Sequence, residues 1–198
     1  DEVEYSGYED ISYIPQNTSL YLWMYQIPIR WNQKQLADEI DEYIRKMQLV
    51  FSQVPQGKEF VAFTLVDIFP TRFTDANFIV REAIVRYNTQ LYNMAGTNVN
   101  FKVIDFSEFT SRYRSEELIG WKFYFISQMY ISSKITSEFA TWVDSKIQNI
   151  ALKRKKCLIL DLDNTLWGGV LGEEGINGIQ IGGDYPGKAF LYFQEALS

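Results

Sequence analysis

The sequence predicts an α/β protein with a doubly wound parallel sheet, followed by the start of a second α/β domain. Apolar runs of strand length alternate with stretches in which apolar residues recur at helical spacing, and this alternation is typical of strands joined by helical crossovers. A further apolar run near the end of the chain, residues 157–160, is closed by Asp161 and Asp163. We therefore expect a first domain over residues 1–150 and the amino-terminal part of a second domain over residues 151–198.

The first strand and the first helix follow an extended beginning. Residues 1–17 are acidic, rich in Tyr and without a period, so we expect an extended leader or loop. Residues 19–25 form a continuous apolar and aromatic run, which predicts a buried strand. From residue 33 to residue 51, apolar residues recur at helical spacing after Asn32, a residue type that caps helices. This stretch is expected to be an amphipathic helix.

Two further strands and a second helix continue the same order. Residues 60–66 and 101–106 are apolar runs typical of central strands, and Ser107 is expected to cap a short helix after the second run. Between them, apolar residues recur at helical spacing from 78 to 94, and Gly96 is expected to end this helix. Strands and helices in this order, joined by right-handed crossovers, form a parallel sheet.

Several polar residues stand where these strands end, at the carboxyl edge where ligands of open α/β sheets bind. We interpret them as loop caps rather than ligands, because polar residues after a strand usually serve the turn. They are Arg30, Asp67, Arg72 and Asp105.

The remainder of the first domain leads to the carboxylate pair. Residues 121–131 are aromatic and have no clear period. A long helix is expected from Ser132 or Ser133 to a basic cluster at 153–156, which suits a solvated helix end. The apolar run 157–160 then predicts a buried parallel strand.

Asp161 and Asp163 follow that strand two positions apart. Carboxylates so close repel each other unless a cation or a shared proton offsets their charge. Mg²⁺ suits the pair, because it prefers oxygen ligands and commonly links carboxylates to a substrate phosphate. One Asp could attack a phosphoryl group while the other gives a proton to the leaving oxygen. The alternatives are a solvated turn and a calcium loop, which would want Gly and Glu where Leu166 and Gly172 stand.

The segment over residues 161–166, at the end of an apolar strand, resembles the first motif of the haloacid dehalogenase (HAD) superfamily. The resemblance implies that Asp161 is the nucleophile, which becomes an aspartyl-phosphate, and that Asp163 is the general acid/base. It also implies Mg²⁺ held by the Asp161 carboxylate and the Asp163 main-chain carbonyl. The second Asp favours phosphoryl transfer over dehalogenation.

The longer run over residues 161–175, with residues 187–190 and 193–194, resembles the FkbH-like branch of this superfamily. FkbH-like proteins are associated with loading a glyceryl unit from a bisphosphoglycerate onto an acyl carrier protein with loss of phosphate. The resemblance therefore implies a phosphorylated small molecule and an acyl carrier protein as partners. A complete HAD site also needs a Ser or Thr, a Lys and a further acidic residue downstream, so we expect a fragment with an incomplete site.

Two more features follow from this resemblance. In the family a flexible flap over the active site follows the first motif, and a surface hairpin is the plainer alternative. The flap residues would be Asn164, Thr165, Trp167, Gly168 and Gly169. The order of elements in residues 1–150 also resembles the Rossmann-like, SGNH-hydrolase-like domain that precedes the HAD domain in FkbH-like proteins.

The composition excludes several classes of function. The net charge of −6, from 19 basic and 25 acidic residues, argues against non-specific binding to nucleic acid or anionic membranes. The absence of His excludes a Ser-His-Asp or Cys-His catalytic set, and with it an SGNH esterase built from this chain alone. The single Cys permits no internal disulfide and fits a reducing cytoplasm. No segment has the length and apolar purity of a transmembrane helix.

Two hypotheses of function remain. The first is a Mg²⁺-dependent phosphatase or phosphotransferase of HAD type, with Asp161 as the nucleophile. The second is a non-catalytic module that docks an acyl carrier protein or a partner domain, favoured by the aromatic-rich first domain. The sequence leaves the substrate, the pathway and the oligomeric state open.

Overall fold

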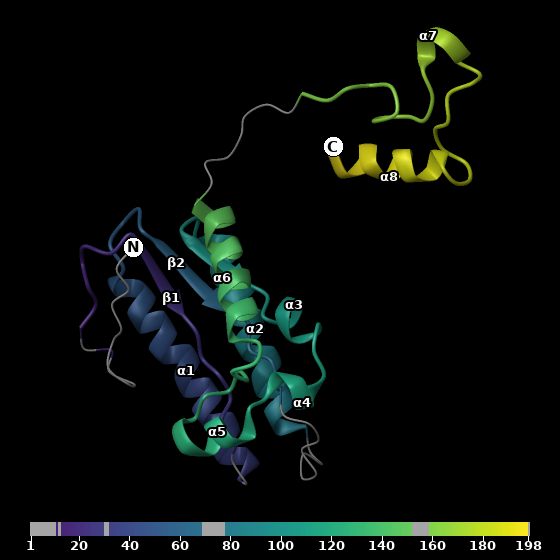
Figure 1. Cartoon of the computed structure of the whole chain (residues 1–198). Helices are drawn as coiled ribbons and strands as arrows, with labels where there is room; N and C mark the ends of the chain where they lie inside the picture. Colours follow the sequence, from purple (N-terminus) through teal and green to yellow (C-terminus); the bar gives the residue numbers. More distant parts are fainter. Residues whose placement is uncertain (1–10, 12, 30–31, 69–77, 152–158, 198) are drawn as a thin grey trace. The chain divides into compact units, whose positions relative to one another are not determined.

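The computed structural model describes residues 11, 13–29, 32–68, 78–151 and 159–197 (Figure 1). The chain divides into two compact units, Asp1–Ala151 and Leu152–Ser198. Most of the predicted leader, the basic cluster at 153–156, Arg30 and Arg72 lie outside the described residues. None of the described helices is long and apolar enough to cross a membrane.

The first unit is built on a parallel sheet of three strands in the order β1-β2-β3. The strands are β1 (Leu20–Trp23), β2 (Glu59–Phe63) and β3 (Phe101–Ile104). In the register, Val61 of the central strand lies opposite Leu22 and Lys102. Four of the five residues of β2 are buried, because a central strand is covered on both faces. The predicted α/β class with a parallel sheet is thus confirmed, while a doubly wound arrangement stays a prediction.

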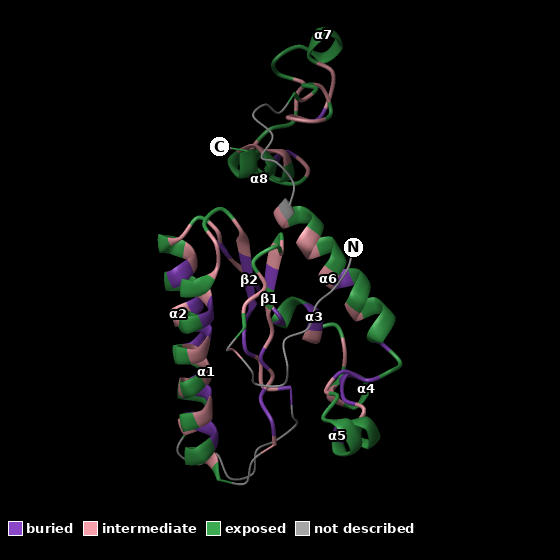
Figure 2. Ribbon diagram, turned by 90° about the vertical axis from the view of Figure 1, so that its left-hand side faces the viewer, coloured by how far each residue is buried: buried purple, intermediate pink, exposed green. Residues whose placement is uncertain are grey.

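Two long helices cover one face of this sheet, α1 (Gln33–Gln53) and α2 (Ile79–Thr97) (Figure 2). Asn32 caps α1 as predicted, because its side chain accepts a hydrogen bond from Gln35 N. Crossovers of one hand between successive strands place their helices on the same face. The side chains buried between these helices and the sheet include Tyr21, Leu36, Ile40, Met47, Phe60, Val80, Tyr87, Leu91 and Phe101.

The other face of the sheet is covered by elements that follow β3 (Figure 2). These are α3 (Ser107–Thr110), α4 (Ser115–Leu118), α5 (Trp121–Ser127) and α6 (Thr136–Ala151). Their core is aromatic: the Phe109 ring lies 5.1 Å from that of Phe139 and 5.3 Å from that of Trp142, between ring centroids. Edge and tilted contacts of this kind stabilise the core beyond the apolar area they bury.

Several boundaries differ from the prediction by a few residues, and for two of them the structure shows the physical cause. Strand β2 ends at Phe63 rather than at residue 66, because the main chain of Leu65 is hydrogen-bonded by the Asn88 side chain instead of by a strand. Helix α2 runs through Gly96 to Thr97, so this glycine is not the stop signal. The helix ends where Asn98 N and the side chains of Thr97 and Asn98 all donate to the carbonyl of Met94.

The second unit holds α7 (Leu171–Glu174) and α8 (Gly187–Leu197). The predicted helix at 187–197 is present, but the predicted strand before the carboxylate pair is wrong in its described part. Ile159, Leu160 and Asp161 lie outside any strand, and Ile159 is 90% exposed. A strand needs a partner for its main-chain groups, and the described residues of this unit form only isolated bridges.

Candidate functional site

The carboxylates of Asp161 and Asp163 lie at the start of the second unit in different surroundings. Asp161 is exposed, and its Oδ1 accepts one hydrogen bond, from Leu162 N at 2.8 Å. Asp163 is partly buried, and its Oδ1 accepts two, from Trp167 Nε1 at 3.0 Å and from Leu171 N at 3.1 Å. Asp161 is therefore accessible to a ligand, whereas one oxygen of Asp163 is already engaged with the chain.

A tight turn follows the pair. Leu166 N donates to Leu162 O at 2.9 Å, and Asn164 adopts a left-handed φ of 54°. Asn is among the residues that tolerate this conformation, because its short side chain bonds nearby main chain. Here Asn164 Oδ1 accepts from Gly169 N at 2.9 Å, while Asn164 N donates to Gly169 O at 3.3 Å. This reciprocal pair closes the loop on itself.

The loop continues into a narrow hairpin held by Gly168 and Gln180. Gly168 N donates to Gln180 O at 3.0 Å, and Gln180 N donates to Gly168 O at 2.8 Å. A Cβ at Gly168 would come within 2.9 Å of Phe190 Cε2, so the close packing of this hairpin on α8 requires glycine. Gln194 of α8 adds a hydrogen bond from its Nε2 to Leu166 O.

The structure thus brings most of the predicted flap residues into one hydrogen-bonded loop, together with Asp163. Thr165 takes part only through its main chain, with Thr165 N donating to Leu162 O at 3.3 Å. That this loop is a flap over an active site, and that Asp161 and Asp163 are catalytic, stay predictions. The role of Trp167 as a partner of Asp163 was missed, since no sequence pattern shows which way an indole N–H points.

The oxygen atoms at the pair suit a hard cation. In the described part of the chain no hydrogen bond reaches Oδ2 of Asp161 or of Asp163, so both remain available. The same residues contain no group of three or more His, Cys, Asp or Glu that could hold a metal. Mg²⁺ is commonly bound through one or two carboxylates and keeps several of its waters.

Of the predicted strand-end residues, Asp105 acts as a cap at the end of β3. Asp105 Oδ1 accepts from Thr64 Oγ1 at 3.0 Å and from Ser107 N at 2.9 Å, and Thr64 Oγ1 accepts from Phe106 N at 2.8 Å. Burial acts to raise the pKa of Asp105, but the hydrogen bonds from Ser107 and Thr64 and the nearby charge of Lys146 outweigh it and lower the pKa. The Asp105 carboxylate therefore ties the ends of β2 and β3 together.

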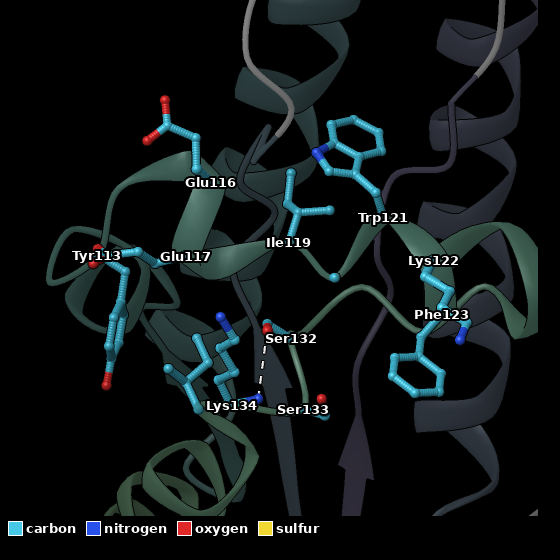
Figure 3. A pocket seen from close by; sticks show the side chains of 12 residues that line it. Tyr113, Glu116, Glu117, Ile119, Trp121, Lys122, Phe123, Ser132, Ser133 and Lys134 are labelled. Carbon is cyan, nitrogen blue, oxygen red and sulfur yellow. Dashed lines mark hydrogen bonds between the residues drawn. The ribbon is translucent and has the colours of Figure 1, made fainter.

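A second candidate site is a surface depression of about 510 Å³ in the first unit (Figure 3). It lies among α4, α5 and the segment before α6, with Ile119 buried and Trp121 and Phe123 each 41% exposed. Ser132 is buried at its edge, and its Oγ accepts a long bond of 3.4 Å from Lys134 N. The depression was not predicted from the sequence. The signal that could have indicated it is the high density of aromatic residues over 121–131.

Apolar side chains continue from this depression along the exposed side of α5 and just beyond it. Phe125 is 75% exposed, Ile126 70% and Met129 49%. Trp121 and Phe125 stack with ring centroids 6.0 Å apart. We call the set formed by Trp121, Phe123, Phe125, Ile126 and Met129 the α5 patch.

Comparison with known proteins gives one informative likeness. No family model and no curated protein matches the chain. A solved structure described as the N-terminal part of the protein BF1531 from Bacteroides fragilis, containing a phosphatase domain and complexed with Mg, is 28% identical, with a TM-score of 0.57. The match covers 83% of this chain and 44% of that one, so the chain spans less than half the length of this relative. The chain is therefore similar, in sequence and in fold, to a protein that contains a phosphatase domain and binds Mg.

Proposed function

We propose that the protein is a Mg²⁺-dependent phosphatase or phosphotransferase of HAD type and that Asp161 and Asp163 carry its chemistry. The observation that carries the proposal is the likeness to a phosphatase-containing structure complexed with Mg, in a chain that exposes Asp161 beside Asp163. The substrate class is a phosphorylated small molecule. The resemblance to FkbH-like proteins, the glyceryl transfer to an acyl carrier protein and the SGNH-like nature of the first unit belong to the same proposal.

The proposed reaction has two steps, formation and breakdown of an aspartyl-phosphate, and each carboxylate acts once in each step. An oxygen of Asp161 forms a bond to phosphorus while the bond from phosphorus to the leaving oxygen breaks, and the Asp163 carboxyl gives its proton to that oxygen. A water or an acceptor hydroxyl then attacks the phosphorus of the aspartyl-phosphate and yields its proton to the Asp163 carboxylate. Asp161 is regenerated as the phosphoryl group departs.

The Asp161 carboxylate and the Asp163 main-chain carbonyl would hold Mg²⁺. The ion offsets the charge of the pair and of the phosphoryl oxygens, which lets an anionic nucleophile approach an anionic substrate. The other elements of a HAD site, a Ser or Thr, a Lys and a further acidic residue, are not assigned to residues of this chain.

The test is Mg²⁺-dependent phosphate release by the longest natural protein that contains this sequence, on acyl phosphates and sugar phosphates. Asp161→Asn keeps the shape of the side chain but removes its charge and nucleophilicity, so release is expected to vanish while the fold remains. Asp184→Asn, which changes an exposed carboxylate of the same unit, is the matched control and should retain release. Turnover of Asp161→Asn at the wild-type rate would contradict the proposal.

The second candidate function is a docking module, which the depression and the α5 patch favour. An exposed cluster of large apolar side chains is unusual on a surface without a binding role. The chain would be titrated against an acyl carrier protein at high micromolar concentration, with Phe125→Ser as the test variant. Val99→Ser is the control, because Val99 is an equally exposed apolar residue outside the patch, at 82%. Failure to bind any carrier, or equal binding by both variants, would count against docking there.

A further inference from the structure

The carboxyl group of Asp163 is held from two directions on one oxygen. Trp167 Nε1 and Leu171 N both donate to Oδ1, at 3.0 Å and 3.1 Å. Each carboxylate oxygen has about two acceptor positions, so Oδ1 is fully used. Within the described residues no hydrogen bond reaches Oδ2. The two oxygens of this carboxyl group therefore have separate tasks.

We propose that Trp167 is a positioning residue for proton transfer, whose indole N–H locks Oδ1 of Asp163 so that Oδ2 alone faces the reacting oxygen. This inference rests on the proposed function, in which Asp163 is the acid/base, and adds a residue and an atom to it. Trp167 holds the group but touches neither substrate nor metal in this assignment.

The surroundings of Trp167 support such a role, because the donor is itself fixed. Trp167 pairs with Asp163 in an isolated main-chain bridge, and its neighbour Gly168 is bonded to Gln180 in both directions. Leu166, on its other side, accepts the bond from Gln194 of α8. An indole ring on so restrained a main chain has little freedom, and a fixed donor holds its acceptor in one orientation.

Asp161 provides the contrast. Its Oδ1 accepts a single bond, from the main chain of the next residue, and the side chain is exposed. A group that must attack phosphorus and hold a cation needs access, whereas a group that passes a proton needs a set orientation. The two carboxylates are thus restrained to different degrees, in line with their proposed roles.

The assignment predicts a dependence on the leaving group. A poor leaving group, such as the alkoxide of an alkyl phosphate, needs the proton from Asp163 as the bond to phosphorus breaks. The phenolate of p-nitrophenyl phosphate leaves without it. Loss of the indole N–H leaves Leu171 N as the single donor to Oδ1 and loosens the orientation of the carboxyl group about its Cβ–Cγ bond. The rate on the alkyl phosphate should therefore fall, and the rate on p-nitrophenyl phosphate should not.

The experiment compares Trp167→Phe with wild type in the longest natural protein that contains this sequence, on propyl phosphate and p-nitrophenyl phosphate. We expect kcat on propyl phosphate to fall about tenfold or more, with KM unchanged, and kcat on p-nitrophenyl phosphate to change by less than about twofold. Trp142→Phe is the matched control, because Trp142 Nε1 is buried without a hydrogen-bond partner and its loss breaks no bond. Equal losses on both substrates would overturn the inference.

A second measurement needs no catalysis. In the ¹⁵N-labelled longest natural protein that contains this sequence, the indole N–H of Trp167 should exchange with solvent faster in Asp163→Ala, which removes the acceptor, than in Asp161→Ala. An unchanged exchange rate in Asp163→Ala would also overturn the inference. Asp161→Asn distinguishes a failure of the proposed function from a failure of the positioning role. Phosphate release that survives Asp161→Asn refutes the proposed function. Release that needs Asp161 but shows no leaving-group effect in Trp167→Phe refutes the positioning role alone.

Discussion

At the scale of single residues, Asn88 completes the hydrogen bonding of the segment that leaves the sheet. Its Oδ1 accepts from Leu65 N at 2.7 Å and its Nδ2 donates to Leu65 O at 3.0 Å. Leu65 is 2% exposed, so water cannot replace these bonds. A side-chain amide on a helix thus takes the place of a neighbouring strand at the carboxyl edge of β2.

Asn88→Ala is expected to destabilise the first unit strongly. The change leaves a buried N–H and a buried C=O of Leu65 without partners, and each costs about 1–3 kcal/mol, so we expect a loss of about 2–4 kcal/mol in the free energy of unfolding. Asn93→Ala, an exposed asparagine on the same helix, is the control and should change it by less than about 0.5 kcal/mol. Urea unfolding followed by circular dichroism measures both, and equal effects would contradict the role of Asn88.

Asp105 is the residue whose charge couples stability to pH. Its pKa in the folded chain lies below the ordinary value of 3.8, so the charged form is favoured by folding. The stability that it contributes is fully present well above pH 3.8 and is lost as the pH falls through the folded pKa. Asp105→Asn keeps an acceptor for Thr64 and Ser107 but removes the charge. Its unfolding midpoint should depend less on pH below about 4 than that of the wild type, and identical acid-side profiles would refute this assignment.

At the scale of elements, two glycines of the first unit show how backbone conformation alone decides the effect of a glycine-to-alanine substitution on stability, because a Cβ has room at both positions. A Cβ would meet nothing within 4 Å at Gly57 or at Gly96, but Gly57 has a φ of +82° in the turn before β2, whereas Gly96 lies inside α2. Gly96→Ala should raise the free energy of unfolding by about 0.5–1 kcal/mol, since alanine loses less entropy in a helix. Gly57→Ala should lower it by about 1–2 kcal/mol. Urea titrations that show the same sign for both would contradict this reading of the backbone.

The elements also show what the sequence could and could not predict. The strands and α1 were predictable because burial produces apolar runs and helical stripes. The end of β2 was not, because it depends on Asn88, 23 positions away in the chain. Helix α5 escaped prediction because Tyr124 is its buried residue while its other aromatic rings are exposed, which leaves no stripe. The apolar run before Asp161 failed as a predictor for the opposite reason. An apolar run favours a buried strand, but a strand forms only where a neighbouring strand pairs with it, and the described residues of the second unit supply none.

The candidate site was predictable only in part, for a related reason. The spacing of Asp161 and Asp163 and the loop-forming residues after them are visible in the sequence. The direction of each hydrogen bond is not, since the bond from Trp167 to Asp163 depends on the left-handed turn at Asn164 and on the bridge from Gly168 to Gln180. Side-chain roles in such a loop follow from its closed geometry rather than from any period.

At the scale of the whole molecule, the two units differ in what holds them together. Both clusters of buried apolar side chains belong to the first unit. In the second unit, the fully buried residues among those described are glycines, Gly168 and Gly187, and the helix α8 exposes Tyr192, Phe193 and Leu197. Hydrogen bonds within a loop contribute little net stability without apolar burial beside them.

We therefore expect the two units to behave differently when produced separately. Residues 1–151 should unfold in one cooperative, sigmoidal transition in urea, because their burial is shared by a single sheet with helices on both faces. Residues 152–198 should show a gradual change of ellipticity and little protection of their amides from exchange, since so short a segment with exposed aromatic side chains cannot offset the entropy of ordering. Circular dichroism and hydrogen exchange on both fragments make the comparison. A sharp transition in residues 152–198 would mean that the Asp163 loop is stable by itself, and the loop would then need no further chain to hold its carboxylates in place.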